Sequence, residues 1–321
     1  MKVCVVGAGA IGGLVAAGFA RAGHEVCAVA RGAHLEALRA RGLTLLTGEK
    51  REVFRLRASD EPSGLGAQDA VFLCLKTHSI AAMLPRMKGL LGRDTVVVPA
   101  INGLPWWYFY KEGGRFDGQP VGCLDPAGTL FRALDPGHIL GCVVHAAAEV
   151  TQPGVVSHSA GRLFILGEPD RTRSTRAERL AAAMNAAGFE AQLADDIRVE
   201  VWTKLVGNLS YNPVAALALA RMNDIHGSEA LLELIRALIR EGMRVAEGYG
   251  VRIPVTVEER VAIAKKLAGA KISMHQDVEK RRPLEVDAVV GAVVELARKA
   301  QIATPMIDAV YALIAERAKH L

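Results

Sequence analysis

Hydrophobic and polar positions follow different periods in the two halves of the chain. In the first half, short apolar runs typical of buried strands alternate with segments of helical period, beginning with KVCVV, IGGLVAAGFARAG and EVCAVA. Further apolar runs lie near 43–47 and 52–57 and at AVFLCLK and TVVVPA, and helical segments lie at AHLEALRARG and near 79–90. Strands and helices that take turns predict right-handed βαβ units around a parallel sheet.

The pattern changes twice further along the chain. Strand-like runs fill 119–167, and a helix over 175–187 and a strand near FEAQL follow. After Asp195 and Asp196, two acids that suit a helix start, the period is helical to the end. The helical segments are 197–220, 228–250, 256–270, 285–300 and 305–319. We therefore predict an α/β domain over 1–196 and an all-α C-terminal domain over 197–321.

Length and composition agree with two domains. The chain has 321 residues, of which 51% are hydrophobic and 23% charged, as in ordinary soluble globular proteins. The 39 basic and 34 acidic residues leave a net charge of +5, which slightly favours anionic ligands. The basic residues are scattered and not interleaved with aromatic ones, so we expect no nucleic-acid partner.

The cysteines indicate a reducing compartment. Five occur, without any C-x-x-C motif, at Cys4, Cys27, Cys74, Cys123 and Cys142. The first three fall inside apolar, strand-like runs. Small buried thiols explain this usage better than disulfides or metal ligands, and we expect a cytoplasmic protein.

The uncharged stretch 3–20 allows two interpretations, a targeting or membrane segment and a nucleotide-binding turn. It contains Gly7-x-Gly9-x-x-Gly12 directly after a strand and at the start of a helix. Such glycines permit a tight turn, backbone approach to a pyrophosphate and close helix–strand packing, and the helix N-terminus binds phosphate. We favour a Rossmann-type dinucleotide-binding domain, and no other stretch reaches the roughly 20 apolar residues of a membrane span. The turn residues predicted to bind the cofactor are Gly7, Ala8, Gly9, Ala10, Ile11 and Gly12.

The end of the second strand favours NADP over NAD. NAD enzymes usually carry an acid there, whereas this chain has Arg31 with no acid beside it. A guanidinium suits a 2′-phosphate, although a solvated arginine in a loop is the alternative. Lys76 and Asn102 also follow predicted strands, where ligands of such sheets bind. The alternatives are a surface lysine and an Asn-Gly turn at Asn102 and Gly103.

Three polar side chains form a stripe on the helix predicted over 197–220. Lys204, Asn208 and Asn212 lie four residues apart and therefore share one helix face. A snorkelling lysine and a hydrogen-bonding asparagine would explain one or two of them. Because burial of all three is unfavourable unless something binds them, we expect a small polar substrate.

Ser273, His275 and Glu285 lie further along the helical half. Ser273 with Gln276 fits a capping box, and Glu285 suits the first turn of a helix. The acids near His275 match no standard ligand spacing, so we expect no metal.

These motifs together resemble the ketopantoate reductase (2-dehydropantoate 2-reductase) family, nearly from end to end. The matching segments are GAGAIGG, Arg31, LKT, INGL, PGVVSHSAGR, WTKLVGNLSYNP, SMHQDVEKRRPLEVDAVVGAVVEL and ATPMIDAVYAL. The resemblance implies NADPH-dependent reduction of a 2-keto acid to a 2-hydroxy acid. The substrate it implies is ketopantoate, reduced to pantoate in pantothenate and coenzyme A biosynthesis.

The resemblance also implies roles for individual residues. Lys204 is similar to the general acid of the family. The residues similar to substrate binders are Asn102, Asn208, Asn212, Ser273 and Asn223, the last in RMNDIH where the family usually has Asn-Gly. Of these, the resemblance places Ser273 near the substrate carboxylate. Lys76, Asn102 and Glu285 are similar to residues that contact the cofactor, with Asn102 between cofactor and substrate.

The chain departs from the family after its Asn-Gly pair. Where the family more often continues NGLG, this chain reads NGLPWWYFY, with its densest aromatic cluster at 106–110. We favour a hydrophobic plug on the sheet or at a subunit interface. The alternative is a substrate-side position that recognises a different 2-keto acid.

Two other functions remain open at this point. One is a related dehydrogenase of a 3-hydroxy acid, opine or polyol phosphate, and the other is a non-catalytic NADPH sensor. A phosphate substrate would require basic residues opposite the stripe, and a sensor would not require Lys204 or Glu285. The apolar C-terminal helix over 305–319 is compatible with a homodimer.

Overall fold

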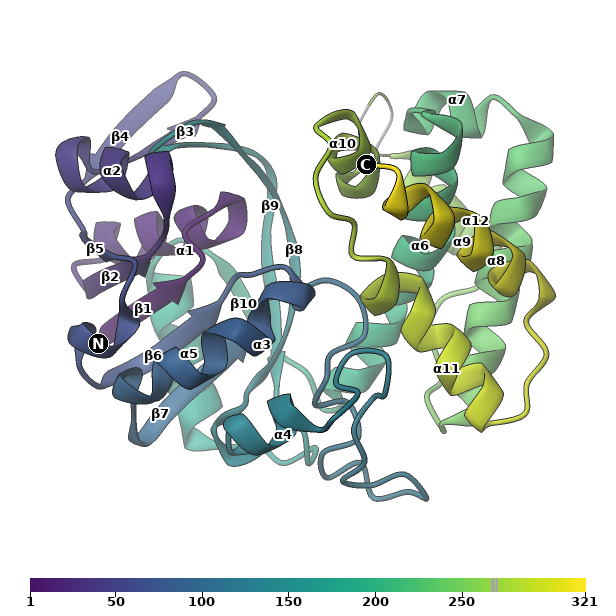
Figure 1. Ribbon diagram of the computed structural model, residues 1–321, viewed down its shortest axis with the longest axis horizontal. Helices are drawn as coiled ribbons and strands as arrows, with labels where there is room; N and C mark the ends of the chain where they lie inside the picture. The colour runs from purple at the N-terminus through teal and green to yellow at the C-terminus, as the bar shows by residue number, and fades with distance from the viewer. Residues whose placement is uncertain (267–268, 270) are drawn as a thin grey trace. The chain divides into compact units, whose positions relative to one another are not determined.

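The structure is a computed structural model that describes residues 1–266, 269 and 271–321 (Figure 1). It divides into two compact units, one formed by 1–101 with 129–197 and the other by 102–128 with 198–321. The segment 102–128 therefore belongs with the helices, whereas the predicted division assigned it to the N-terminal domain.

The first unit contains the predicted parallel sheet. Its strands are β1 (Lys2–Val6), β2 (Glu25–Val29), β5 (Arg57–Ser59), β6 (Gln68–Leu73) and β7 (Leu91–Pro99). Their order is β5-β2-β1-β6-β7, and each neighbouring pair is parallel. The connecting helices include α1 (Ala10–Arg21) and α2 (Gly32–Arg41). In place of one helix near 79–90, the chain forms a short α3 (Ile80–Met83) between 3-10 turns at Thr77–Ser79 and Leu84–Leu90.

A second sheet completes this unit. Its strands are β3 (Leu43–Thr47), β4 (Lys50–Phe54), β8 (Gly141–Gln152), β9 (Val155–Gly167) and β10 (Glu190–Leu193). The order is β10-β9-β3-β4, with β8 antiparallel to β9. The run near 43–47 and the first half of the run near 52–57 thus form an antiparallel hairpin of this sheet, whereas Arg57 begins β5 of the parallel one. The unit also contains α4 (Thr129–Ala133), α5 (Thr175–Ala186) and 3-10 turns at Pro62–Leu65 and Pro136–His138.

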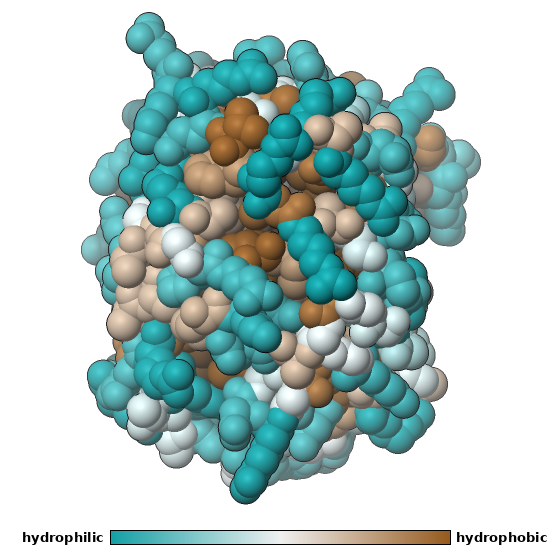
Figure 2. Space-filling view, turned by 90° about the vertical axis from the view of Figure 1, so that its left-hand side faces the viewer, coloured by the Kyte–Doolittle hydropathy of each residue, from teal (hydrophilic) through white to brown (hydrophobic). Residues whose placement is uncertain are grey.

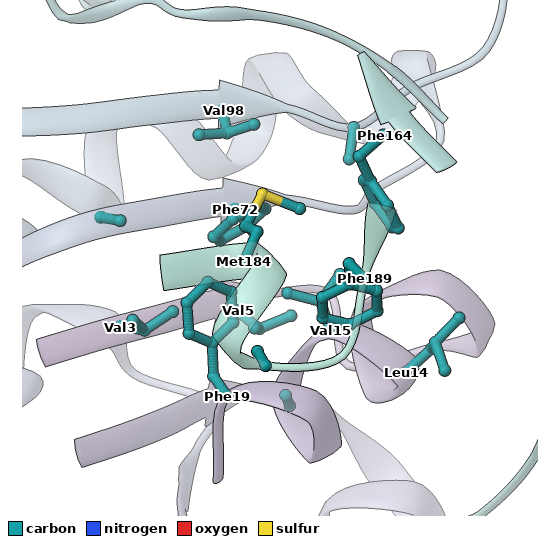
Figure 3. Close-up of a cluster of buried hydrophobic side chains, with 14 of the residues drawn as sticks. Val3, Val5, Leu14, Val15, Phe19, Phe72, Val98, Phe164, Met184 and Phe189 are labelled. Carbon is teal, nitrogen blue, oxygen red and sulfur yellow. The ribbon is translucent and has the colours of Figure 1, made fainter. Parts of the chain in front are cut away.

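Helix α1 packs on strands of both sheets and joins them into one core. Figure 3 shows Val15 and Phe19 of α1 among side chains from β1, β6, β9 and α5. Glycines make this close approach possible, because a Cβ at Gly13 would lie 2.6 Å from Val156 Cγ2 and one at Gly18 would lie 2.5 Å from the Phe189 ring. Each fully buried aromatic or aliphatic side chain stabilises such a core by about 1.5–3 kcal/mol.

The second unit is helical, as predicted. Its helices are α6 (Ile197–Ala218), α7 (Met222–His226), α8 (Glu229–Gly248), α9 (Val257–Lys265), α10 (Ser273–Glu279), α11 (Ala292–Lys299) and α12 (Pro305–Lys319). A π-helical turn at Asp287–Gly291 leads into α11 and replaces the start of the helix predicted over 285–300. The helix predicted over 256–270 ends at Lys265, and its positions 267, 268 and 270 lie outside the described residues.

Helix α8 is the centre of this unit. It packs on α7, α9, α11 and α12, and at Gly242 it approaches Leu209 of α6. The buried carboxylate of Glu241 accepts hydrogen bonds from the backbone N–H groups of Met306 and Ile307, at 3.3 and 2.9 Å. These N–H groups belong to the first turn of α12, and the first N–H groups of a helix have no carbonyl acceptor within their own helix.

The aromatic cluster of the 102–128 segment is a plug in the helical unit. Trp106, Trp107, Tyr108 and Phe109 are at most 1% exposed. Trp202 of α6 donates from Nε1 to the Tyr108 hydroxyl at 2.7 Å, and the two rings meet edge to face. The plug was predicted, and within the helical unit it packs on α6.

A buried arginine holds the plug in place. Arg198 of α6 has no solvent exposure and donates to the Tyr108 carbonyl at 2.9 Å and to the Tyr110 carbonyl at 2.7 Å. Its guanidinium carbon also lies over the Tyr108 ring, 5.7 Å from the ring centroid. The loop therefore has a fixed course, because its carbonyls satisfy a buried charge.

The surface is mixed in character. On the face shown in Figure 2, hydrophilic residues predominate and hydrophobic ones lie between them in small groups. The exposed large hydrophobic side chains among the described residues are Val53, Leu219, Ile263, Met306 and Leu313, of which the last two lie on α12. No helix formed by the described residues is both long enough and apolar enough to cross a membrane.

Candidate active site

The glycine turn between β1 and α1 leaves room at one of its three glycines. Gly7 has φ +93°, and a Cβ on it would lie 2.7 Å from the Cys74 carbonyl oxygen. A Cβ on Gly12 would lie 2.1 Å from the Gly7 carbonyl oxygen. A Cβ on Gly9, in contrast, would meet nothing within 4 Å. The first and third glycines therefore serve the turn itself, and the second keeps a space open.

That space lies at the N-terminus of α1. Gly9 is the N-cap residue, and no side chain caps the helix. The first N–H groups of a helix lack partners inside it and carry a partial positive charge. This arrangement fits a phosphate group, which needs close backbone approach and N–H donors.

Arg31 and Lys76 lie at the same edge of the parallel sheet as the glycine turn. Val6, Val29 and Leu73 are in register at the carboxyl ends of β1, β2 and β6. Arg31 follows the second of these strands, is exposed, and has no ion-pair partner among the residues that the structure describes. Lys76 follows the third and is half-buried at the start of a 3-10 turn. The sheet register thus gathers two cations near the α1 N-terminus.

In the helical unit, Lys204 is oriented by Asn102. The ammonium donates to Asn102 Oδ1 at 2.9 Å. Lys204 is half-buried on α6, and Asn102 is half-buried at the start of the 102–128 segment. A lysine side chain is flexible, so a carboxamide acceptor restricts the positions its ammonium takes.

The π-helical turn holds Asn102 in position. The next residue, Gly103, has φ +81°, and a Cβ there would lie 2.3 Å from the Ala288 carbonyl oxygen. That carbonyl accepts a hydrogen bond from the Leu104 N–H at 2.7 Å. The Asn-Gly turn considered as an alternative is present, and it also positions Asn102. Short π segments in helices occur frequently at functional sites.

The predicted stripe lies on one continuous helix. α6 runs through 197–218, so Lys204, Asn208 and Asn212 project from one face of it. Asn208 is half-buried and Asn212 is 6% exposed. One turn before Lys204, Glu200 is half-buried, and desolvation raises the pKa of its carboxyl group.

Asn223, Ser273 and Glu285 lie on other segments of the helical unit than α6. Asn223 is exposed on α7 and accepts a hydrogen bond from the Gly269 N–H at 3.1 Å. Ser273 is exposed in the first turn of α10, whose N-cap is Ile272. Glu285 is half-buried just before the π-helical turn.

The capping box predicted at the start of α10 is not formed. The N-cap side chain, that of Ile272, makes no hydrogen bond to the helix. Gln276 donates instead from Nε2 to the Lys271 carbonyl at 2.7 Å. The prediction was wrong by one residue, because Ser273 is the first helical position and cannot cap it from there.

Sequence reasoning missed three features of this unit: Arg198, the π-helical turn and Arg260. Arg198 lies on the apolar face of α6 with Trp202, and a charge on such a face was a usable signal. Arg260 of α9 packs against Gly207 of α6, where a Cβ would lie 1.7 Å from its Nη2. A glycine inside a helix marks such a close approach. No local pattern signals the π-helical turn.

Comparisons with known proteins indicate one family over nearly the whole chain. The N-terminal profile described as "Ketopantoate reductase PanE/ApbA" matches residues 3–171, and its C-terminal counterpart matches residues 196–318. A 2-dehydropantoate 2-reductase of Mesorhizobium japonicum is 44% identical over 315 residues, 98% of this chain and 97% of that protein.

Solved structures with the same fold include one from Ralstonia solanacearum MolK2, of a protein assigned provisionally to the ketopantoate reductases. It is 35% identical, covers 99% of this chain and 98% of its own, and has a TM-score of 0.94. A ternary structure of D-mandelate dehydrogenase with NADH and anilino(oxo)acetate has a TM-score of 0.87 at 20% identity, with 100% and 99% coverage. The latter similarity concerns the fold alone.

Proposed function

The chain belongs to the ketopantoate reductase family, and on that premise we propose that it reduces a 2-keto acid to a 2-hydroxy acid with NADPH. The leading substrate is 2-dehydropantoate, as in the name of the Mesorhizobium relative, and the product is then pantoate, an intermediate of pantothenate biosynthesis. The observation that carries the proposal is the hydrogen bond between Lys204 and Asn102.

The glycine turn suits the pyrophosphate of a nicotinamide dinucleotide. Support comes from the open space at Gly9 and the uncapped start of α1. When bound, the cofactor supplies the hydride that reduces the ketone. We assign pyrophosphate binding to the residues of the turn, which are Gly7, Ala8, Gly9, Ala10, Ile11 and Gly12.

Arg31 gives the preference for NADPH. It is exposed at the N-cap of α2, at the strand end where the ribose of a dinucleotide is recognised. An arginine binds a 2′-phosphate with two charge-assisted hydrogen bonds. NADH has no 2′-phosphate and therefore cannot form them. We also assign Lys76 and Glu285 to the cofactor, the former because it lies at the same sheet edge.

Lys204 is the general acid of the proposed reaction. Negative charge develops on the carbonyl oxygen as hydride reaches its carbon, and an ammonium stabilises this charge and then donates its proton. Asn102 orients the ammonium by accepting its hydrogen bond and does not itself exchange a proton. Proton donation from a fixed group of this kind typically accelerates a reaction by about 10²- to 10⁴-fold.

The asparagines of α6 orient the substrate. Asn208 and Asn212 offer N–H donors and carbonyl acceptors on the helix face that carries Lys204. Such groups suit the carboxylate and hydroxyl groups of a small hydroxylated keto acid. Asn223 and Ser273 complete the proposed set on the strength of the family resemblance.

We place the reaction in the cytoplasm, because all five cysteines are free thiols, as a reducing compartment would keep them. The proposed partner is a small-molecule 2-keto acid. A homodimer remains a proposal that sedimentation would test.

A substrate panel assayed by loss of NADPH absorbance tests the proposal. It contains 2-dehydropantoate, an aliphatic 2-keto acid, an aromatic 2-keto acid and a 3-keto acid, each with NADPH and with NADH. We expect the highest kcat/KM for 2-dehydropantoate with NADPH. Tight NADPH binding without turnover of any 2-keto acid would contradict the proposal and favour a sensor.

A further inference from the structure

Arg260 presents a guanidinium to helix α6, and no group among the described residues neutralises it. Its Nη2 lies 1.7 Å from where a Cβ of Gly207 would stand, so the guanidinium fills the space above that glycine. Its Nε is buried and has no hydrogen-bond partner among the described residues. No ion pair or other interaction with a carboxylate is found for it in the described part of the chain.

Arg260 is half-buried, and an unpaired guanidinium that is partly removed from water is unfavourable without an anion. Arginine keeps its charge at neutral pH, and removal of a charge from water is costly unless a counter-charge accompanies it. Burial lowers the pKa of Arg260, and only the Tyr211 phenol opposes this change. Arg236, whose charge also acts on the Tyr211 phenol, differs sharply, because its guanidinium has ion pairs with Glu229, Glu233 and Glu258.

Gly207 brings the guanidinium to the face of α6 that carries Lys204. The two residues are three apart, so their Cβ positions are about 5–6 Å from each other on neighbouring turns. At 3.6 residues per turn, Gly207 lies about 60° from Lys204 around the helix, and Asn208 lies about 40° away in the other direction. Lys204 is therefore flanked by a cation on one side and by a carboxamide on the other.

Resting on the reduction of a 2-keto acid proposed above, we propose that Arg260 binds the substrate carboxylate adjacent to the reacting carbonyl. In a 2-keto acid this carboxylate is bonded directly to the carbonyl carbon. A cation beside the proton donor is therefore placed where the carboxylate lies when the carbonyl oxygen meets Lys204. The planar guanidinium has the fork of donors that matches a carboxylate.

This assignment explains why a glycine stands at position 207. Glycine is disfavoured inside a helix, and alanine would be the better helix former. Gly207 is buried beneath the guanidinium, and a methyl group there would force the guanidinium away from α6. Gly207→Ala thus displaces Arg260 without removing its charge.

The test compares an acid with its uncharged ester in steady-state kinetics on the full-length enzyme at saturating NADPH. The substrates are 2-dehydropantoate and its methyl ester, which keeps the ketone and loses the negative charge. The variants are Arg260→Met, Arg260→Lys and Gly207→Ala. The matched control is Lys265→Met, which removes an exposed cation from the same helix.

We expect Arg260→Met to raise KM for the acid by about 10- to 100-fold, the effect of one lost charge-assisted contact. The kcat/KM for the ester should stay within twofold, Arg260→Lys should recover part of the loss, and Gly207→Ala should raise KM for the acid in the same direction. Lys265→Met should leave both substrates unchanged.

An equal change of kcat/KM for acid and ester in Arg260→Met would overturn the assignment, since a structural role affects both substrates alike. If that variant does not fold, as judged by its thermal unfolding, Arg260→Lys and Gly207→Ala decide by the same acid-to-ester ratio. A wild-type enzyme that reduces no 2-keto acid would instead overturn the proposed function, and is distinguished by its lack of turnover before any substitution.

Discussion

The glycine turn and the Lys204 site are built in different ways. Sterics within a few residues determine the turn, where a Cβ on Gly7 or Gly12 would collide with backbone. The Lys204 site is assembled from the 102–104 loop, α6 and the π-helical turn, which are far apart in sequence and are joined by hydrogen bonds. A local motif can thus be recognised from the sequence alone, whereas a site made of distant segments is recognised only when the structure is known.

The largest expected effect comes from adding one methyl group at each of two glycines of the turn, which tests whether local sterics determine it. Gly12→Ala places a Cβ 2.1 Å from the Gly7 carbonyl oxygen, so we expect the free energy of unfolding to fall by about 1–3 kcal/mol or more and NADPH binding to be lost. Gly9→Ala has room and should change stability by about 0.5 kcal/mol or less, while it weakens NADPH binding.

Urea denaturation and calorimetric titration with NADPH measure these two effects separately. Equal destabilisation by the two substitutions would contradict the division of roles within the turn.

A substitution in the Lys204 site should lower activity because the ammonium is misplaced, and not because the protein is less stable. Asn102→Ala removes the acceptor that orients the ammonium, and we expect kcat to fall by about 100-fold, as for a catalytic group displaced by an ångström. NADPH binding and the unfolding midpoint should change little. A kcat within twofold of wild type would show that Lys204 needs no orientation by Asn102.

The cofactor preference should depend on one exposed side chain. Arg31→Ala is expected to raise the Kd for NADPH by about 10-fold or more, the value of a hydrogen bond to a charged group, and to leave the Kd for NADH unchanged. Fluorescence titration of both cofactors measures this. Equal affinity of the wild-type protein for the two cofactors would refute the role given to Arg31.

Much of the fold could be predicted from the sequence, because periodicity reports which face of an element is buried. The parallel sheet, the helical second half and the start of α6 after Asp196 were predicted and are confirmed. The membership of 102–128 in the helical unit was not predictable, since it depends on Arg198 and Trp202, which contact the aromatic plug from α6.

The candidate site was predictable in part for the same reason. The spacing of Lys204 and Asn208 indicates a shared helix face, but nothing in the spacing pairs Lys204 with Asn102 across about a hundred positions. The π-helical turn that fixes Gly103 has no local signature, and the orphaned guanidinium of Arg260 is visible only when its surroundings are known.

The smallest expected effect concerns the pH dependence of stability. Burial raises the pKa of Glu200 in the folded protein, so the carboxyl group favours folding while it is protonated. That contribution is fully present below the unfolded-state pKa and is lost as pH rises through the folded-state pKa. The wild-type protein therefore loses free energy of unfolding between the unfolded-state and the folded-state pKa of Glu200. Glu200→Gln, which does not ionise, should retain that free energy at pH 7. Urea midpoints at pH 4 and pH 7 measure the difference, and an identical pH dependence in both proteins would contradict the cause given.

The central claim is that Lys204 donates the proton to the reduced carbonyl, and single-turnover reduction of 2-dehydropantoate by Lys204→Ala tests it most directly. With NADPH binding measured in the same samples, we expect the rate of hydride transfer to fall by about 10²- to 10⁴-fold while the Kd for NADPH stays within twofold. A rate within a few-fold of wild type would contradict the assignment of Lys204 as the general acid.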